Sequence, residues 1–188
     1  MTTAKGAARR TALLDAAESV LLTGGHTALS LRAVADSAGV RLGHLQYYFP
    51  SRDSLVAEVL ARILQRSLDR FTEAAPAGGP GDLVTLVLDQ HTDAELVRVF
   101  TELWALAARD ESVATAVRGF YDRYAELLTE RIRGHAPTLS ADEQRARAET
   151  FIALVEGASL LRSGVAGNPS PATDEVIART ALALLTGA

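Results

Sequence analysis

The chain has 188 residues, a formal net charge of −4 and no cysteine. This length is enough to bury a real core, and the lack of cysteine excludes a disulfide framework, a thiolate metal site and a cysteine nucleophile. No run of eighteen residues is apolar and uncharged, which excludes a membrane span. We also expect a cytoplasmic protein that does not bind a membrane.

The charge is unevenly distributed along the chain. Residues 1–52 hold six Lys or Arg and three acidic residues, a balance of +3, which leaves −7 for the remainder. A basic N-terminal piece on an acidic body indicates contact with a polyanion at one end, although chance variation of surface charge gives the same picture.

Apolar residues recur three and four positions apart almost everywhere, which predicts an all-α protein of about nine helices. The first is expected from about Lys5 to Leu22, closed by Gly24-Gly25. Because Asp15 and Glu18 interrupt its apolar run, it is an amphipathic helix rather than a signal peptide. The other helices are expected near 31–38, 41–48, 51–74, 83–90, 94–108, 111–134, 141–163 and 171–186.

Three local signals set boundaries near the N-terminus. Ser30 offers an N-cap hydroxyl to the second helix, and Gly39 ends that helix. The third helix must end before Pro50, because a residue that precedes proline is pushed out of the α region. The Gly/Pro-rich residues 75–82 read as a linker.

Residues 30–48 form two short helices joined by a tight turn and preceded by a longer one. That order is typical of a helix-turn-helix, whose second helix enters the DNA major groove. An ordinary pair of antiparallel helices has the same outline, so the residue pattern must decide between them.

The pattern combines Ser30, Ala38-Gly39-Val40, Gly43, Tyr47-Tyr48-Phe49 and Arg52-Asp53-Ser54-Leu55. With these features the stretch TALSLRAVADSAGVRLGHLQYYFPSRDSL, residues 27–55, resembles the DNA-binding domain of the TetR family of bacterial transcriptional regulators. The resemblance implies a helix-turn-helix domain over residues 1–50 and a helical ligand-binding and dimerisation domain over 51–188, with 51–74 as the connecting helix.

Leu45 and Phe49 lie four residues apart and should point inward, which leaves the remaining side chains of the third helix for an outer, DNA-reading face. The Gln46 side chain can form two hydrogen bonds with adenine, and the Arg41 side chain can bind guanine or a phosphate. Gly43 allows a close approach to the DNA, and the resemblance adds contacts from the second helix and its cap. The predicted DNA-binding residues are Thr27, Ser30, Arg32, Arg41, Leu42, Gly43, His44, Gln46, Tyr47, Tyr48 and Arg52.

Gln46 replaces the tyrosine often found at its position in the family, and Tyr48 replaces a common histidine. The bases of the operator therefore do not transfer from a relative. Taken singly, each polar residue of the set could also be an ordinary surface side chain.

Aromatic residues at helical spacing in the second half could line a small-molecule cavity or simply form core. The predicted ligand-binding residues are Phe100, Leu103, Trp104, Phe120, Tyr121, Tyr124, Phe151, Val155 and Glu156. His91, Glu102 and Arg162 are further polar candidates.

The resemblance implies a homodimer through the last two helices, although those helices could instead complete the core of one chain. No metal-ligand spacing, phosphate-binding glycine loop or catalytic set occurs, so we expect no metal, no cofactor and no enzyme. We expect a repressor that binds a palindromic double-stranded operator and is released by a small, largely apolar effector. The alternatives are a helical-bundle enzyme or carrier without DNA binding, and a DNA binder that activates or has no effector.

Overall fold

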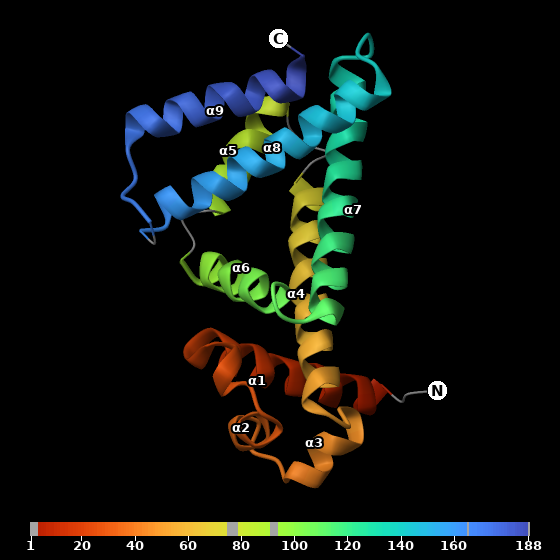
Figure 1. Cartoon of the computed structure of the whole chain (residues 1–188). Coiled ribbons are helices and arrows are strands. Elements are labelled where there is room, and N and C mark those ends of the chain that lie inside the picture. Colours follow the sequence, from red (N-terminus) through yellow and green to blue (C-terminus); the bar gives the residue numbers. More distant parts are fainter. Residues whose placement is uncertain (1–3, 75–78, 91–93, 165, 188) are drawn as a thin grey trace. The chain divides into compact units, whose positions relative to one another are not determined.

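In the computed structural model, the residues described are 4–74, 79–90, 94–164 and 166–187. They contain only helices as regular structure, which confirms the all-α prediction (Figure 1). The helices are α1 (Ala4–Ala28), α2 (Leu31–Ser37), α3 (Leu42–Tyr48), α4 (Arg52–Ala74), α5 (Pro80–Gln90), α6 (Ala94–Ala107), α7 (Glu111–His135), α8 (Ala141–Arg162) and α9 (Pro171–Thr186). Their order and number match the prediction.

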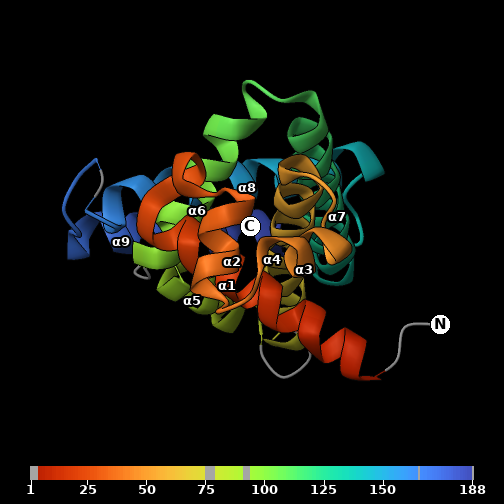
Figure 2. The same ribbon diagram turned by 90° about the horizontal axis from the view of Figure 1, so that it is seen from below.

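The chain divides into two compact units. One comprises Met1–Gln65 with Arg98–Val117, and the other comprises Arg66–Val97 with Arg118–Ala188. In the first unit α2 packs against both α1 and α3, and both short helices lie on the same side of α1 (Figures 1 and 2). In the second unit α8 and α9 pack against each other, and α5 packs against both.

Each unit has an apolar core of leucine, valine and aromatic side chains. Leu13, Leu29, Val34 and Leu45 of the first unit are completely buried, and Leu128 and Ile132 of the second are as well. The burial of these apolar side chains holds short helices such as α2 and α3 in place, because a seven-residue helix is not stable alone in water.

The start of α5 differs from the sequence prediction. The helix begins at Pro80 rather than near residue 83, so the last part of the predicted linker is helical. Proline fits the first turn of a helix, where its missing N–H has no partner to lose. Asp82 adds a cap, because its Oδ2 accepts a hydrogen bond of 2.8 Å from the Gly79 backbone N–H. Residues 75–78 of that linker lie outside the described residues.

Candidate DNA-binding site

A break in α1 directs the chain toward α2. Gly25 has φ 68° and ψ −178°, which interrupts the helix where the sequence predicted its end. The predicted N-cap then begins α2, because Ser30 Oγ accepts a hydrogen bond of 3.2 Å from the Ala33 N–H. Gly39, at φ 63°, makes the turn to α3 in a left-handed conformation that side chains other than glycine adopt at a cost.

Two side chains hold α3 on the domain. Leu45 and Phe49 are both completely buried, as the sequence predicted. The Arg10 guanidinium of α1 lies 5.3 Å from the centre of the Phe49 ring and also pairs with Glu58. The inner side of α3 is therefore fixed, and its orientation follows from that anchoring.

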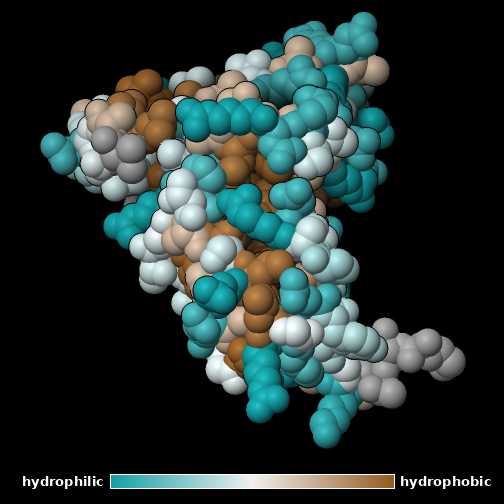
Figure 3. Space-filling model, turned by 60° about the horizontal axis from the view of Figure 1, so that its bottom comes forward, coloured by the Kyte–Doolittle hydropathy of each residue, from teal (hydrophilic) through white to brown (hydrophobic). Residues whose placement is uncertain are grey.

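The other side of α3 faces solvent. Tyr47 keeps 81% of its surface exposed, and Arg41, Gly43, His44 and Gln46 are also exposed. The remaining predicted DNA-binding residues are exposed or half-buried: Thr27, Ser30, Arg32 and Arg52 are exposed, and Leu42 and Tyr48 are half-buried. The lower part of the surface in Figure 3, where Figure 1 has α1 to α3, is largely hydrophilic around a narrow hydrophobic strip.

Three rings stack along the exposed side of α3. The centre of the Tyr48 ring lies 5.1 Å from that of Tyr47 and 5.6 Å from that of His44, both edge to face. Edge-to-face contacts of this kind are a favoured arrangement of aromatic pairs.

Arg52 has structural partners that the sequence did not reveal. Its Nε donates a hydrogen bond of 2.7 Å to the Leu29 carbonyl oxygen, and its second terminal nitrogen donates one of 2.8 Å to the His26 carbonyl oxygen. Arg52 thus joins the start of α4 to the segment that leads into α2.

The predicted ligand-binding residues fall in both compact units. Leu103 is buried in the first unit, where Phe100 and Trp104 are half-buried with ring centres 6.3 Å apart. In the second unit Phe120, Tyr124, Phe151 and Val155 are buried. The centre of the Tyr124 ring lies 4.9 Å from that of Phe71 and 6.1 Å from that of Phe120.

One polar pair lies among these aromatic residues. The Tyr121 hydroxyl donates a hydrogen bond of 3.0 Å to Glu156 Oε1, which links α7 to α8. Burial raises the pKa of Glu156 to about 7, against the lowering effect of the Tyr121 hydrogen bond. Burial also raises the pKa of Tyr124, and the nearby Glu156 adds to that shift.

The other polar candidates have different surroundings. Glu102 of α6 contacts His26 of α1, and Arg162 lies 3.6 Å from Asp174 at the start of α9. His91 lies outside the described residues. In the parts of the chain that the structure describes, no group of three or more acidic or histidine side chains is arranged to hold a metal ion. None of the helices described there is long and apolar enough to cross a membrane.

The anchored, outward-facing α3 and the capped α2 define the helix-turn-helix of a DNA-binding protein. Two family models match the chain: bacterial regulatory proteins of the tetR family over residues 13–59, and the C-terminal domain of BetI-type transcriptional repressors over residues 82–188. The chain therefore belongs to the TetR family of transcriptional regulators.

Individual relatives agree with this assignment. An uncharacterised HTH-type transcriptional regulator of Xanthobacter autotrophicus is 33% identical over 157 residues, covering 79% of this chain and 76% of that protein. The repressor KstR of Rhodococcus jostii is 38% identical over 86 residues, covering 46% of this chain and 40% of its own length. The structure of GusR from Salmonella enterica superposes with a TM-score of 0.77 at 21% identity, covering 98% and 96% of the two chains, and shows the same fold.

These matches confirm that the protein is a DNA-binding transcriptional repressor and not an enzyme.

Proposed function

We propose that α3 enters the major groove of a palindromic operator and reads its bases with Gln46, Tyr47 and Arg41. Thr27, Ser30, Arg32, Leu42, Gly43, His44, Tyr48 and Arg52 would contact the neighbouring bases and backbone. The observation that supports this proposal most strongly is the division of α3 into a completely buried side, Leu45 and Phe49, and an outer side where Tyr47 is 81% exposed. An exposed tyrosine on the outer side of a helix-turn-helix is available to contact a binding partner.

We infer that the protein acts in the cytoplasm. The test therefore begins at the salt and pH of the cytoplasm, with DNA duplexes that the wild-type protein selects from random sequence. The double variant Gln46→Ala, Tyr47→Ala should lose the selected duplex while its melting temperature stays close to that of the wild type, because neither residue is buried. Ser19→Ala, an exposed change on α1, should leave affinity unchanged. Unchanged affinity of the double variant would refute the proposed reading face.

We further propose that residues 1–50 bind DNA and that residues 51–188 carry an effector site and a dimer interface. The dimer would form through α8 and α9, where Leu161, Val176 and Leu182 are 45%, 51% and 38% exposed. Large apolar side chains gathered on two helices favour an interface, and a two-fold dimer would present two α3 helices to the two half-sites.

Val176→Glu with Leu182→Glu tests the interface by placing charges on it. We expect a dimer-to-monomer change in analytical ultracentrifugation, together with weaker binding to the full palindrome. Thr72→Glu adds a charge to an exposed position of α4 and should leave the dimer intact. A double variant that remains dimeric would exclude α9 from the interface.

The effector that we propose is small and largely apolar, with one polar group that reaches the Tyr121–Glu156 pair. The aromatic rings around Tyr124 supply apolar contacts, and the half-buried Tyr121 and Glu156 supply one donor and one acceptor. Such an effector releases DNA only if it binds better to the conformation that fits the operator less well. A compound that dissociates the complex in a library screen should act at higher concentrations on Tyr121→Phe, and an unchanged release concentration would remove Tyr121 from the site.

A further inference from the structure

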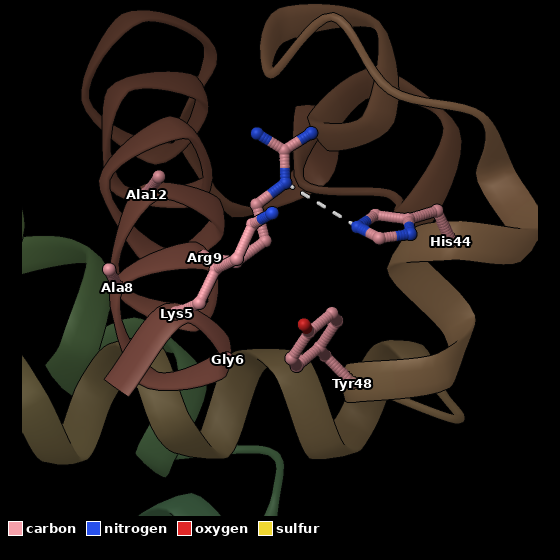
Figure 4. Close-up of a pocket in the computed structure, with 7 residues that line it drawn as sticks. All are labelled: Lys5, Gly6, Ala8, Arg9, Ala12, His44 and Tyr48. Atoms are coloured by element: carbon pink, nitrogen blue, oxygen red, sulfur yellow. Dashed lines mark hydrogen bonds between the residues drawn. The ribbon is translucent and has the colours of Figure 1, made fainter. Parts of the chain in front are cut away.

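A hollow lies between the N-terminal part of α1 and one side of α3 (Figure 4). It is lined by Lys5, Gly6, Ala8, Arg9, Ala12, His44 and Tyr48. Its volume of about 600 Å³ is far larger than the ~30 Å³ occupied by a water molecule, so the hollow has room for a group such as a phosphate with its sugar. All seven lining residues belong to one compact unit.

Two of the lining residues carry a positive charge, and three of them have small side chains that leave space in the hollow. Lys5 and Arg9 are four residues apart, so they lie on the same side of α1. Gly6, Ala8 and Ala12 are small, and none of the seven lining residues is acidic. The neighbouring cation Arg10 differs, since it pairs with Glu58. The charge of Lys5 and Arg9 is therefore not neutralised by an acid within the hollow.

A neutral contact positions Arg9. Its Nε donates a hydrogen bond of 3.4 Å to His44 Nε2, shown by the dashed line in Figure 4. Because a guanidinium can only donate, His44 Nε2 acts as the acceptor and carries no proton in this arrangement. This contact is made to an imidazole and not to an acid, so it does not offset the positive charge of Arg9.

His44 and Tyr48 lie on the side of α3 that lines the hollow. They are four residues apart, so they lie on the same side of α3. Their side chains point into the hollow with those of Lys5 and Arg9. A helix about 10–12 Å wide fills a major groove about 12 Å wide, so its flanks face the phosphate walls. The hollow consequently opens where a wall of the groove would run.

We propose that Lys5 and Arg9 of α1, with Tyr48 of α3, bind one phosphate group of the operator backbone at the edge of the groove that α3 enters, while His44 positions Arg9. The inference rests on the proposed docking of α3. The two cations supply charge, and the Tyr48 hydroxyl supplies a donor. The site adds affinity and fixes the position of α3, but it reads no base.

The first experiment measures affinity against salt for Lys5→Gln with Arg9→Gln, which keeps a polar side chain at both positions and removes the positive charge. On the selected duplex and on an unrelated duplex of equal length, we expect a similar fall in affinity of about tenfold. The slope of log affinity against log salt should become shallower by about two per dimer, because one phosphate per protomer is no longer neutralised. Arg123→Gln, an exposed cation of α7 that pairs with Glu126, is the matched control and should change neither quantity.

A second experiment locates the phosphate. Single neutral methylphosphonate groups are placed at each position of the selected duplex, and the affinity of both proteins is measured. One position per half-site should weaken the wild type but not the double variant. Identical position profiles for both proteins, or an unchanged salt slope, would overturn the proposal. Loss of affinity confined to the selected duplex would also overturn it, since that result indicates a base contact.

The two proposals fail separately. If the docking of α3 is wrong, the Gln46→Ala, Tyr47→Ala variant binds the selected duplex as the wild type does. If only the phosphate site is wrong, that variant loses the duplex, whereas Lys5→Gln with Arg9→Gln keeps it with an unchanged salt slope.

Discussion

Glu102 of α6 holds His26 of α1 by two contacts: its Oε2 lies 2.7 Å from His26 Nδ1 and accepts a hydrogen bond of 3.2 Å from the His26 backbone N–H. A methyl group at Gly25 would lie 3.2 Å from the Glu102 carboxylate, so this carboxylate sits directly against the break in α1. Arg52 donates a hydrogen bond of 2.8 Å to the His26 carbonyl oxygen. The segment that orients α2 is thus fixed by residues from α4 and α6.

The first prediction concerns pH. Hydrogen bonding from His26 lowers the pKa of Glu102 below its ordinary 4.5, with burial opposing the shift. The folded protein therefore holds this proton less tightly than the unfolded chain does, and the stabilisation is present above pH 4.5 and is lost as pH falls through the folded pKa. Glu102→Gln should melt at a lower temperature than the wild type at pH 7 and at the same temperature in strong acid.

Glu130→Gln, an exposed acid of α7, is the control for that comparison and should leave the melting temperature unchanged at both pH values. A difference between Glu102→Gln and the wild type that persists in strong acid would show that the carboxylate charge is not the cause.

The second prediction separates two roles of Arg52. Because its guanidinium binds the Leu29 and His26 carbonyl oxygens, Arg52→Ala should lower the free energy of unfolding by about 1 to 2 kcal/mol in urea titrations. Arg52→Lys should recover only part of this loss, since a single ammonium does not reproduce the fork of donors. If Arg52 served DNA alone, both variants would unfold as the wild type does and differ only in operator affinity.

The third prediction uses a pair of glycines in helices. A methyl group added at Gly43 of α3 or at Gly119 of α7 would meet nothing within 4 Å. Both Gly→Ala changes should therefore raise the free energy of unfolding by about 0.5 to 1 kcal/mol. Only Gly43→Ala should weaken DNA binding, by about 1 to 3 kcal/mol in a titration, because the space above Gly43 would be filled by the operator. Equal operator affinity of the two variants would place Gly43 away from the DNA.

The sequence predicted the elements well because their signals are local. Ser30, Gly39 and Pro50 act on neighbouring backbone groups, and the helical spacing of Leu45 and Phe49 shows which side of α3 is buried. Contacts such as Arg52 with His26, or Glu102 with His26, join residues far apart in the chain. The spacing of residues along the sequence does not predict such contacts. The same is true of Lys5 and Arg9, whose position beside α3 depends on how α1 packs, although the N-terminal excess of positive charge was a partial signal.

The last prediction concerns Glu156. Burial raises its pKa from 4.5 to about 7, so between these values the folded protein holds a proton that the unfolded chain has released. Stability due to this group therefore falls as pH rises from 4.5 to about 7. Glu156→Gln keeps an acceptor for the Tyr121 hydroxyl and has no charge to bury. It should raise the free energy of unfolding by about 1 to 3 kcal/mol at pH 8 and have little effect at pH 4.

Glu149→Gln is the matched control for Glu156, because it lies on the same helix but is exposed and pairs with Arg145. It should not stabilise the protein at pH 8. Urea titrations at pH 4 and pH 8 measure the free energy of unfolding of each variant. If Glu156→Gln stabilises the protein equally at both pH values, packing and not the buried charge is responsible. A gain found at pH 8 and not at pH 4 would show that the ionised carboxylate of Glu156 destabilises the folded chain.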